Sequence, residues 1–244
     1  MPRARENRFV LILFGVLFLL TAFLCSNSAS ASVNAPQEVS AEERQKIVEK
    51  FRMLHKDMRS VFATVTQEKQ LAALKKKVVV EGTVMMARPN MLKWDVVKPE
   101  RSVTAIDGET MTVYYPDIKE AQVYALSDNL IARNTMSFFS TAMSGDLNEM
   151  ESKFTVTIFR QDGEIDFRLV PLSKIVGRYL SAVVIHYDEA TGLPKGFEVA
   201  TPKGDRTITR LTNIKVNPEI RPEAFQIKLP GDVWITNKVE PRNN

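Results

Sequence analysis

The sequence predicts a mainly β protein: an antiparallel meander, as either a barrel or a sandwich, with one N-terminal helix and one apolar helical insert. Three observations support this fold class. Strand-like segments recur about every ten residues, and residues typical of tight turns separate them. Only two stretches have the apolar periodicity of a helix. There is no internal repeat, and the length suits one all-β domain or two small ones.

The first thirty-one residues have the order of a secretory signal peptide. Arg3, Arg5 and Arg8 precede the apolar run Phe9–Cys25, and Ala29–Ala31 forms a small-x-small cleavage site. We expect residues 1–31 to be removed, leaving residues 32–244 as one exported domain.

Two alternatives concern the same segment. The apolar run is about seventeen residues long, at the short edge of what spans a bilayer, so an uncleaved anchor is one alternative. Acylation of Cys25 is the other. Phe23 and Leu24 disfavour it, because a lipobox has small residues at those positions.

Charge and cysteine content exclude several classes of function. The net charge is +4, three of the basic residues lie in the leader, and such a balance demands neither nucleic acid nor an anionic membrane. Lys75–Lys77 is the only basic run, and we interpret it as a solubilising hairpin turn; contact with a membrane or an acidic partner is the alternative. Residues 32–244 contain no cysteine, which excludes disulfides, thiolate metal sites and a cysteine nucleophile.

The first predicted helix begins at Ser40 and runs to about Arg59. Ser40 and Glu43 have the spacing of a capping box. Its apolar stripe consists of Ile47, Val48, Phe51, Leu54 and Met58.

Twelve strand segments follow in two groups. The first group is Val61–Gln70, Val78–Ala87, Met91–Val97, Ser102–Ile106, Met111–Tyr115 and Gln122–Ala125. The second group is Phe154–Arg160, Ile165–Pro171, Ala182–Tyr187, Gly196–Ala200, Thr207–Lys215 and Phe225–Leu229. Turns such as Asp107-Gly108 and Asp162-Gly163 predict hairpins between neighbours.

The helical insert lies between the groups, from Asp128 to Met143. Its large apolar residues are Leu130, Ile131, Met136, Phe138, Phe139 and Met143. Three further methionines, Met85, Met86 and Met91, lie on either side of the turn at Arg88-Pro89-Asn90. Methionine is flexible and polarisable, so these residues suit either a core or a surface that accepts variable apolar ligands.

Groups for catalysis or metal binding are sparse, and we expect no enzymatic activity, metal or cofactor. No nucleophile elbow, phosphate loop or His-x-x-x-His motif is present. Glu164 with Asp166, and His186 with Asp188, share alternate positions on strands, as glycosidase or metal residues could. Such pairs are more often the solvated face of a half-buried strand.

The segment Arg88-Pro89-Asn90-Met91-Leu92-Lys93-Trp94 resembles the signature of the LolA-type periplasmic lipoprotein carriers. Further motifs of that family follow in the same order along nearly the whole of residues 32–244. They are Phe62–Gln67, Pro99, Asp107-Gly108, Tyr114–Pro116, Leu169–Pro171, Gly192–Pro194 and Phe225–Pro230.

The resemblance implies an unclosed antiparallel β-barrel of about eleven strands whose helices form a lid. It implies a monomeric periplasmic chaperone that takes lipoproteins, by their acyl chains, from an inner-membrane ABC transporter. Delivery would be to an outer-membrane receptor or to the outer membrane itself, with no nucleic acid involved. The alternative is a periplasmic module of the same fold that binds another lipid or senses the envelope.

The resemblance also suggests site residues. It implies that Arg88 hydrogen-bonds lid backbone and so latches the empty hollow; a solvent-exposed turn arginine is the alternative. Leu92 matches a position at the mouth of the hollow, and Trp94 is either cavity wall or core. The full set of candidate acyl-binding residues is Leu92, Trp94, Met85, Met86, Leu130, Ile131, Met136, Phe138 and Phe139.

Overall fold

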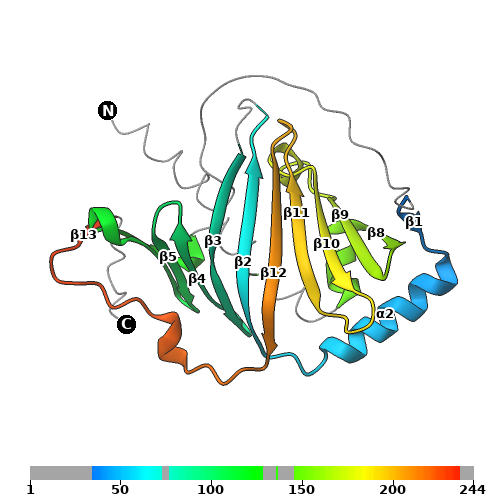
Figure 1. The fold of residues 1–244 in the computed structure, drawn as a ribbon, viewed down its shortest axis with the longest axis horizontal. Helices are drawn as coiled ribbons and strands as arrows, with labels where there is room; N and C mark the ends of the chain where they lie inside the picture. The colour runs from blue at the N-terminus through cyan, green and yellow to red at the C-terminus, as the bar shows by residue number, and fades with distance from the viewer. Residues whose placement is uncertain (1–34, 73–76, 129–135, 137–145, 237–244) are drawn as a thin grey trace. The chain divides into compact units, whose positions relative to one another are not determined.

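The computed structural model describes residues 35–72, 77–128, 136 and 146–236. Thirteen strands form one mixed sheet in the order β1-β8-β9-β10-β11-β12-β2-β3-β4-β5-β6-β7-β13 (Figure 1). The two ends of this order, β1 and β13, are edge strands, so the described sheet is unclosed. The prediction of a mainly β fold with an N-terminal helix is therefore confirmed.

Eleven of the strands are six residues or longer. They are β2 (Ser60–Gln70), β3 (Lys77–Ala87), β4 (Met91–Lys98), β5 (Ser102–Asp107), β6 (Thr110–Tyr115), β7 (Glu120–Ala125), β8 (Phe154–Gln161), β9 (Glu164–Pro171), β10 (Ala182–Asp188), β11 (Pro194–Ala200) and β12 (Arg206–Val216). Two short strands, β1 (Gln37–Glu38) and β13 (Trp234–Thr236), complete the sheet. The helical elements are α2 (Ala41–His55), α4 (Leu147–Glu151) and the 3-10 turns η1 (Pro116–Ile118), η2 (Leu126–Asp128), η3 (Val176–Arg178) and η4 (Pro222–Phe225).

The chain divides into two compact units. Unit 1 includes α2, α4, β8 to β11 and the first half of β12, and unit 2 includes β4 to β7, η4 and β13. The boundary between them crosses β2, β3 and β12. Each unit has its own apolar core, described separately below.

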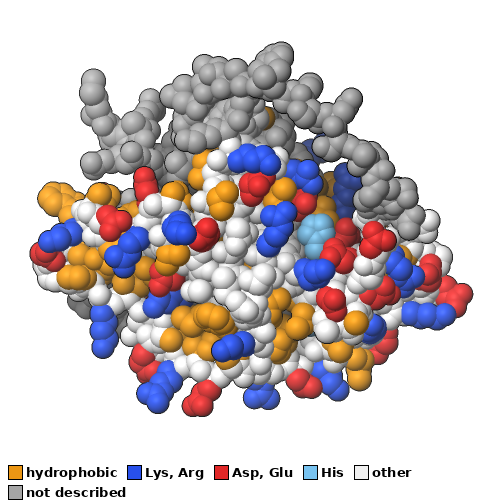
Figure 2. Space-filling model, viewed as in Figure 1, with side chains coloured by type: hydrophobic (Ala, Val, Ile, Leu, Met, Phe, Trp, Pro, Cys, Tyr) orange, Lys and Arg blue, Asp and Glu red, His pale blue; other side chains and the backbone are white. Residues whose placement is uncertain are grey.

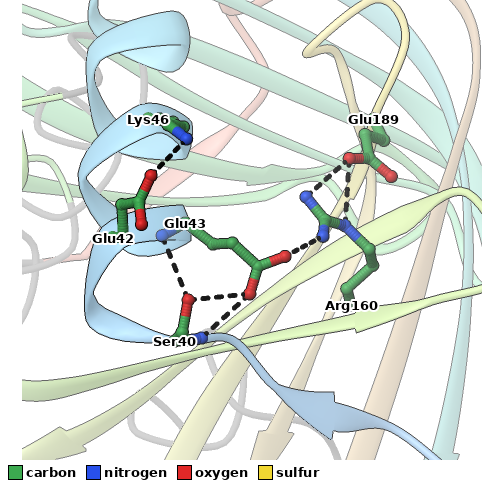
Figure 3. A network of polar contacts seen from close by, with 6 residues as sticks. All are labelled: Ser40, Glu42, Glu43, Lys46, Arg160 and Glu189. Carbon is green, nitrogen blue, oxygen red and sulfur yellow. Dashed lines mark hydrogen bonds and ion pairs between the residues drawn. The ribbon is translucent and has the colours of Figure 1, made fainter.

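The start of α2 in unit 1 is fixed by the predicted capping box. The Ser40 hydroxyl accepts a hydrogen bond from the Glu43 backbone N–H at 3.3 Å, and the Glu43 carboxylate accepts one from the Ser40 N–H at 3.1 Å (Figure 3). Two orphan donors of the first turn are thereby satisfied. The same carboxylate pairs with Arg160 of β8, which also pairs with Glu189. The first turn of α2 is therefore tied to the sheet.

An aromatic cluster forms the core of unit 1 beneath α2. The Phe51 ring lies 5.2 Å from Phe167 of β9 and 4.8 Å, edge-on, from Tyr187 of β10, measured between ring centroids. All three side chains are buried. Burial in this cluster raises the pKa of the Tyr187 phenol. Phe51 of the predicted apolar stripe thus packs on β9 and β10, whereas Leu54 of that stripe is 44% exposed. The helix ends at His55 rather than near Arg59, so Met58 of the stripe lies outside it.

Unit 2 has a core on one face of its strands. Ala63, Val65 and Val84 are its buried centre, and Met86, Trp94, Leu211 and Ile214 pack against them. Asn213 has a φ of +52°, and this left-handed residue breaks the alternation of β12, so Leu211 and Ile214 both contact the same cluster. The bulge lets one strand contribute two neighbouring apolar side chains to one face.

Most predicted turns match, but one predicted strand is wrong. Asp162 and Gly163 have φ values of +47° and +79°, as a type I′ hairpin turn requires. Phe225–Leu229 does not form a strand: Phe225 ends η4, is 1% exposed and packs near β4 and β5. Pro222 starts this turn, since its fixed φ suits the first position of a helical turn.

Several other elements differ from the expectation. β1, β13 and α4 were not predicted, and β13 pairs with β7 in parallel, so the sheet is mixed rather than purely antiparallel. The insert at 128–143 lies mainly outside the described residues, as do Lys75 and Lys76. No helix in the described ranges combines the length and the apolar character needed to cross a bilayer.

Candidate functional site

The sequence motif at Arg88–Trp94 forms the turn between β3 and β4 and the first half of β4, in unit 2. Registry places Leu92 opposite Met86, and Trp94 opposite Val84. On its other side, β4 pairs with β5, which places Leu92 opposite Ile106. Because opposed residues in a sheet share a face, Met86, Leu92 and Trp94 lie on the same apolar face.

That face continues across the neighbouring strands. Ile106 of β5 lies opposite Met111 of β6, and both are buried. We call these residues the apolar face of unit 2: Ala63, Val65, Val84, Met86, Leu92, Trp94, Ile106 and Met111. Met85 precedes Met86 on the same strand, so its side chain points to the opposite face of the sheet. A ligand on the apolar face would therefore contact Met86 and not Met85.

Two side chains bring unpaired donors to this region. Nε and Nη2 of Arg88 are buried without a hydrogen-bond partner among the described residues, and so is Nε1 of Trp94. Native proteins rarely leave such donors unpaired, because each costs about 1–3 kcal/mol. Hydrocarbon cannot satisfy them, but a carbonyl oxygen can. The arrangement therefore suits a molecule or segment that presents carbonyl groups beside apolar chain.

The backbone of this turn is held in place from two directions. The Arg88 N–H donates to the Arg59 carbonyl at 2.9 Å, and the Arg59 N–H donates to Oδ1 of Asn217 at 2.7 Å. The Asn90 amide donates to the carbonyl of Gly108 in the β5–β6 turn at 2.8 Å. Gly108 has a φ of +107°, and a Cβ there would lie 3.3 Å from Asn90. Asn90 of the motif is thus explained as a structural residue that fixes the Arg88 turn.

The remaining candidate residues are only partly described. Leu92 is 5% exposed and Met136 is 5% exposed, so both are buried. Leu130, Ile131, Phe138 and Phe139 lie outside the described residues. Their assignment to a cavity, and the latch role of Arg88, stay predictions.

A second polar cluster lies in unit 1, on the face of β9 to β11 opposite the aromatic core. Nδ1 of His186 lies 2.7 Å from the Asp166 carboxylate, and Nε2 lies 3.7 Å from Glu198. These two acceptors raise the pKa of His186 to about 9. The same contact with His186, helped by Arg206, lowers the pKa of Glu198 to about 2.

The chemistry of this cluster favours an ion pair over a reactive site. Glu164, Asp166 and His186 could bring one ligand atom each within 4.8 Å of one another, as a metal would need. However, a general base must be a neutral imidazole, and the two carboxylates that raise the pKa of His186 to about 9 keep the ring protonated at neutral pH. Lys195 also pairs with Glu164, and Arg206 with Glu198. The sequence alone signalled Glu164, Asp166 and His186, but it did not signal Glu198.

Lys69 is a polar residue that sequence reasoning missed. It follows Gln67 by two positions on β2 and so lies on the same face, where Gln67 donates to the Thr209 hydroxyl at 3.0 Å. Burial lowers the pKa of the Lys69 amine. No sequence pattern marked this lysine, because its burial depends on strands far away in the chain.

The surface in view gives no support for nucleic-acid binding. On the face that Figure 2 shows, acidic and basic side chains are interspersed rather than gathered by sign. A nucleic-acid site on that face would need a continuous basic stripe.

Comparison with known proteins gives the family. The model of the family described as outer membrane lipoprotein carrier protein LolA matches residues 56–228. The outer-membrane lipoprotein carrier protein of Pseudomonas syringae pv. tomato is 23% identical over 149 residues, covering 61% of this chain and 68% of that protein. That of Pseudomonas putida (strain W619) is 22% identical over 216 residues, covering 88% of this chain and 95% of that protein.

Solved structures that this chain matches include an uncharacterized conserved protein from Thermus thermophilus. It has a TM-score of 0.48 at 13% identity and covers 80% of this chain and 98% of that one. A LolA superfamily protein from Nitrosomonas europaea has a TM-score of 0.39 at 13% identity and covers 75% and 97%. The family match covers well over half of the sequence and includes the Arg88–Trp94 segment, so this chain belongs to the LolA family of outer membrane lipoprotein carrier proteins.

Proposed function

We propose that this protein is a periplasmic chaperone that binds lipoproteins by their acyl chains and carries them to the outer membrane. Residues 1–31 are removed on export, and residues 32–244 act as the carrier. It receives lipoproteins from an inner-membrane ABC transporter and passes them to an outer-membrane receptor or to the outer membrane itself. Its task needs no covalent step and no cofactor.

The observation that carries this proposal is the apolar face of unit 2 with the three buried N–H donors on Arg88 and Trp94 that lack an acceptor among the described residues. Acyl chains match the apolar side chains Met86, Leu92 and Trp94. Ester or amide carbonyls at the head of the acylated cysteine match the donors. In this proposal Arg88 is a latch, because its donors hydrogen-bond lid backbone when no cargo is bound.

The energetics of the cargo explain why such a carrier is needed. Each buried CH₂ contributes about 0.8 kcal/mol, so one long acyl chain in water costs on the order of 10 kcal/mol. A lipoprotein released without shelter would aggregate or return to the membrane it left. A carrier whose binding is also opposed by latch closure releases its load more readily, and that makes onward transfer possible.

The test is a release assay with the purified protein without residues 1–31. Inner-membrane vesicles containing the lipoprotein-releasing transporter are supplied with ATP and with this protein, and the soluble fraction is analysed for lipoprotein. We expect a soluble one-to-one complex that requires ATP. Absence of lipoprotein from the soluble fraction, under conditions where a known carrier succeeds, would contradict the proposal.

Lipid analysis of the same protein purified from cells separates the alternative. Phospholipid or glycolipid in stoichiometric amount, together with failure in the release assay, would instead indicate a module that binds another lipid or senses the envelope.

A further inference from the structure

The loop between β9 and β10 displays three large apolar side chains to solvent. We call residues 172–181 the β9–β10 loop. Leu172 is 57% exposed, Ile175 68% and Tyr179 66%. Scattered single apolar residues are ordinary on a protein surface, but three such exposed side chains within eight positions of one loop need an explanation.

Backbone hydrogen bonds within the loop fix its conformation. The Gly177 N–H donates to the Ser173 carbonyl at 2.9 Å, and the Leu180 N–H donates to the Val176 carbonyl at 3.0 Å. Its two ends are fixed as well: the Leu172 N–H donates to Lys153, and the Ser181 N–H donates to Ala200. Leu180 is buried and anchors the loop, while Ile175 and Tyr179 stay outside. The loop is therefore an ordered feature of unit 1.

The charges of the loop are all of one sign. Lys174 and Arg178 are both exposed, neither forms an ion pair with any described residue, and residues 172–181 contain no acid. The acids that are near the start of the loop in α4 are already paired, Glu149 with Lys153 and Glu151 with Arg44. Within the described part of the chain, the loop thus presents two unneutralised cations interleaved with Leu, Ile and Tyr.

We propose that the β9–β10 loop is a membrane-docking element that inserts Leu172, Ile175 and Tyr179 into the headgroup region of an anionic bilayer. Protein segments that lie in a membrane interface combine aliphatic and aromatic side chains with neighbouring Lys and Arg. Lys174 and Arg178 would meet lipid phosphates, each strengthening binding about fivefold. The proposal concerns the surface of the protein and does not depend on what its apolar face carries.

A second exposed apolar group offers a contrast. Ile118 is 67% exposed and lies beside Lys119, whose carbonyl accepts a hydrogen bond from the Trp234 N–H. Here Lys119 is paired with Asp232, and Asp117 and Glu120 flank it. Because its cation is neutralised, this group lacks the attraction to anionic lipid, and it serves as the matched control.

The test uses the purified protein without residues 1–31 and sedimentation with large vesicles. One set is pure phosphatidylcholine, and the other is equal parts phosphatidylcholine and phosphatidylglycerol. We expect binding to the anionic set alone, weakened by added salt. Leu172→Ser with Ile175→Ser should weaken it roughly tenfold or more. Lys174→Ser with Arg178→Ser should weaken it roughly 25-fold.

The controls are Ile118→Ser for exposed apolar surface and Lys203→Ser with Lys228→Ser for surface charge. Both should leave vesicle binding unchanged within about twofold. Circular dichroism melts of every variant show that the fold is kept. No binding of the wild type to anionic vesicles, or an equal loss in the loop and control variants, would overturn the proposal. Since no lipoprotein is present, either result leaves the release assay to test the carrier function separately.

Discussion

Arg88 and Trp94 each hold buried N–H groups without an acceptor among the described residues, and this fixes how the two side chains respond to substitution. An unpaired buried donor destabilises the folded state, so such groups are retained for what they bind. Removing the Trp94 donor should therefore keep or raise the stability of the empty protein, whereas removing the Arg88 donors should change ligand binding through loss of the latch.

Trp94→Phe removes the indole N–H and keeps an aromatic ring. We expect the free energy of unfolding to be unchanged or raised, because relief of about 1–3 kcal/mol offsets the smaller ring. Trp94→Ala should lower it by about 3–5 kcal/mol, since the ring packs in the unit 2 core. Urea titration of both variants checks this, and an equal loss in the two would mean that the indole N–H has an acceptor.

Arg88→Leu should change how an apolar fluorescent probe binds. Without the Arg88 donors the latch is lost, so the probe should bind more tightly, by roughly tenfold if one charge-assisted hydrogen bond is removed. Arg101→Leu is the matched control, because Arg101 is an exposed arginine in the turn between β4 and β5. Identical probe affinities for Arg88→Leu and wild type would contradict the latch.

The ion pair at His186 predicts a dependence of stability on alkaline pH. Its pKa is raised from 6.5 to about 9 in the folded state, so the stabilisation is complete below pH 6.5 and is lost as pH rises through about 9. We expect His186→Gln to flatten the decline in thermal stability between these two pH values. At the acid end of the pH range Glu198 keeps the pair charged, because its pKa of about 2 leaves it ionised down to strongly acid pH. A melting profile of His186→Gln that still falls over this window, in parallel with the wild type, would refute the ion pair.

At the scale of elements, α2 is attached to unit 1 through its buried stripe and through its first turn. Phe51→Ala removes the side chain that contacts both Phe167 and Tyr187, and we expect a loss of about 3–5 kcal/mol in the free energy of unfolding. Met53→Ala on the same helix should change it by less than about 0.5 kcal/mol, because Met53 is 48% exposed. Comparable losses in the two variants would show that the helix docks by another face.

The elements that sequence predicted well are those set by local patterns. Ser40 and Glu43 cap the first helix as expected, and Asp162-Gly163 makes the hairpin that two positive φ values allow. The predicted strand bounds lie within about two residues of the observed ones in all eleven long strands. Alternation and turn chemistry are sufficient for these segments.

The elements that sequence missed depend on distant partners. β13 exists because Trp234–Thr236 pairs with β7, more than a hundred residues earlier. Phe225 looked like the start of a strand, but its burial near β4 and β5 made its segment a turn instead. Glu198 meets His186 only through the register of β10 with β11.

The candidate site was also predicted only in part from the sequence. The Arg88–Trp94 motif was visible in sequence, whereas the opposite directions of Met85 and Met86 follow from strand geometry.

At the scale of the whole molecule, membership of the LolA family and the unpaired donors beside an apolar face support the same activity. The central claim is that acyl chains, and not the protein part of a lipoprotein, are what this carrier recognises. Binding should therefore be governed by acylation of the cargo.

Native mass spectrometry with matched cargo tests this claim most directly. One lipoprotein is prepared in its triacylated form and, by replacing its acylated cysteine, in a form without lipid; each is mixed with the purified protein without residues 1–31. We expect a one-to-one complex with the triacylated form and none with the lipid-free form. Equal binding of both forms, or binding of neither, would contradict it.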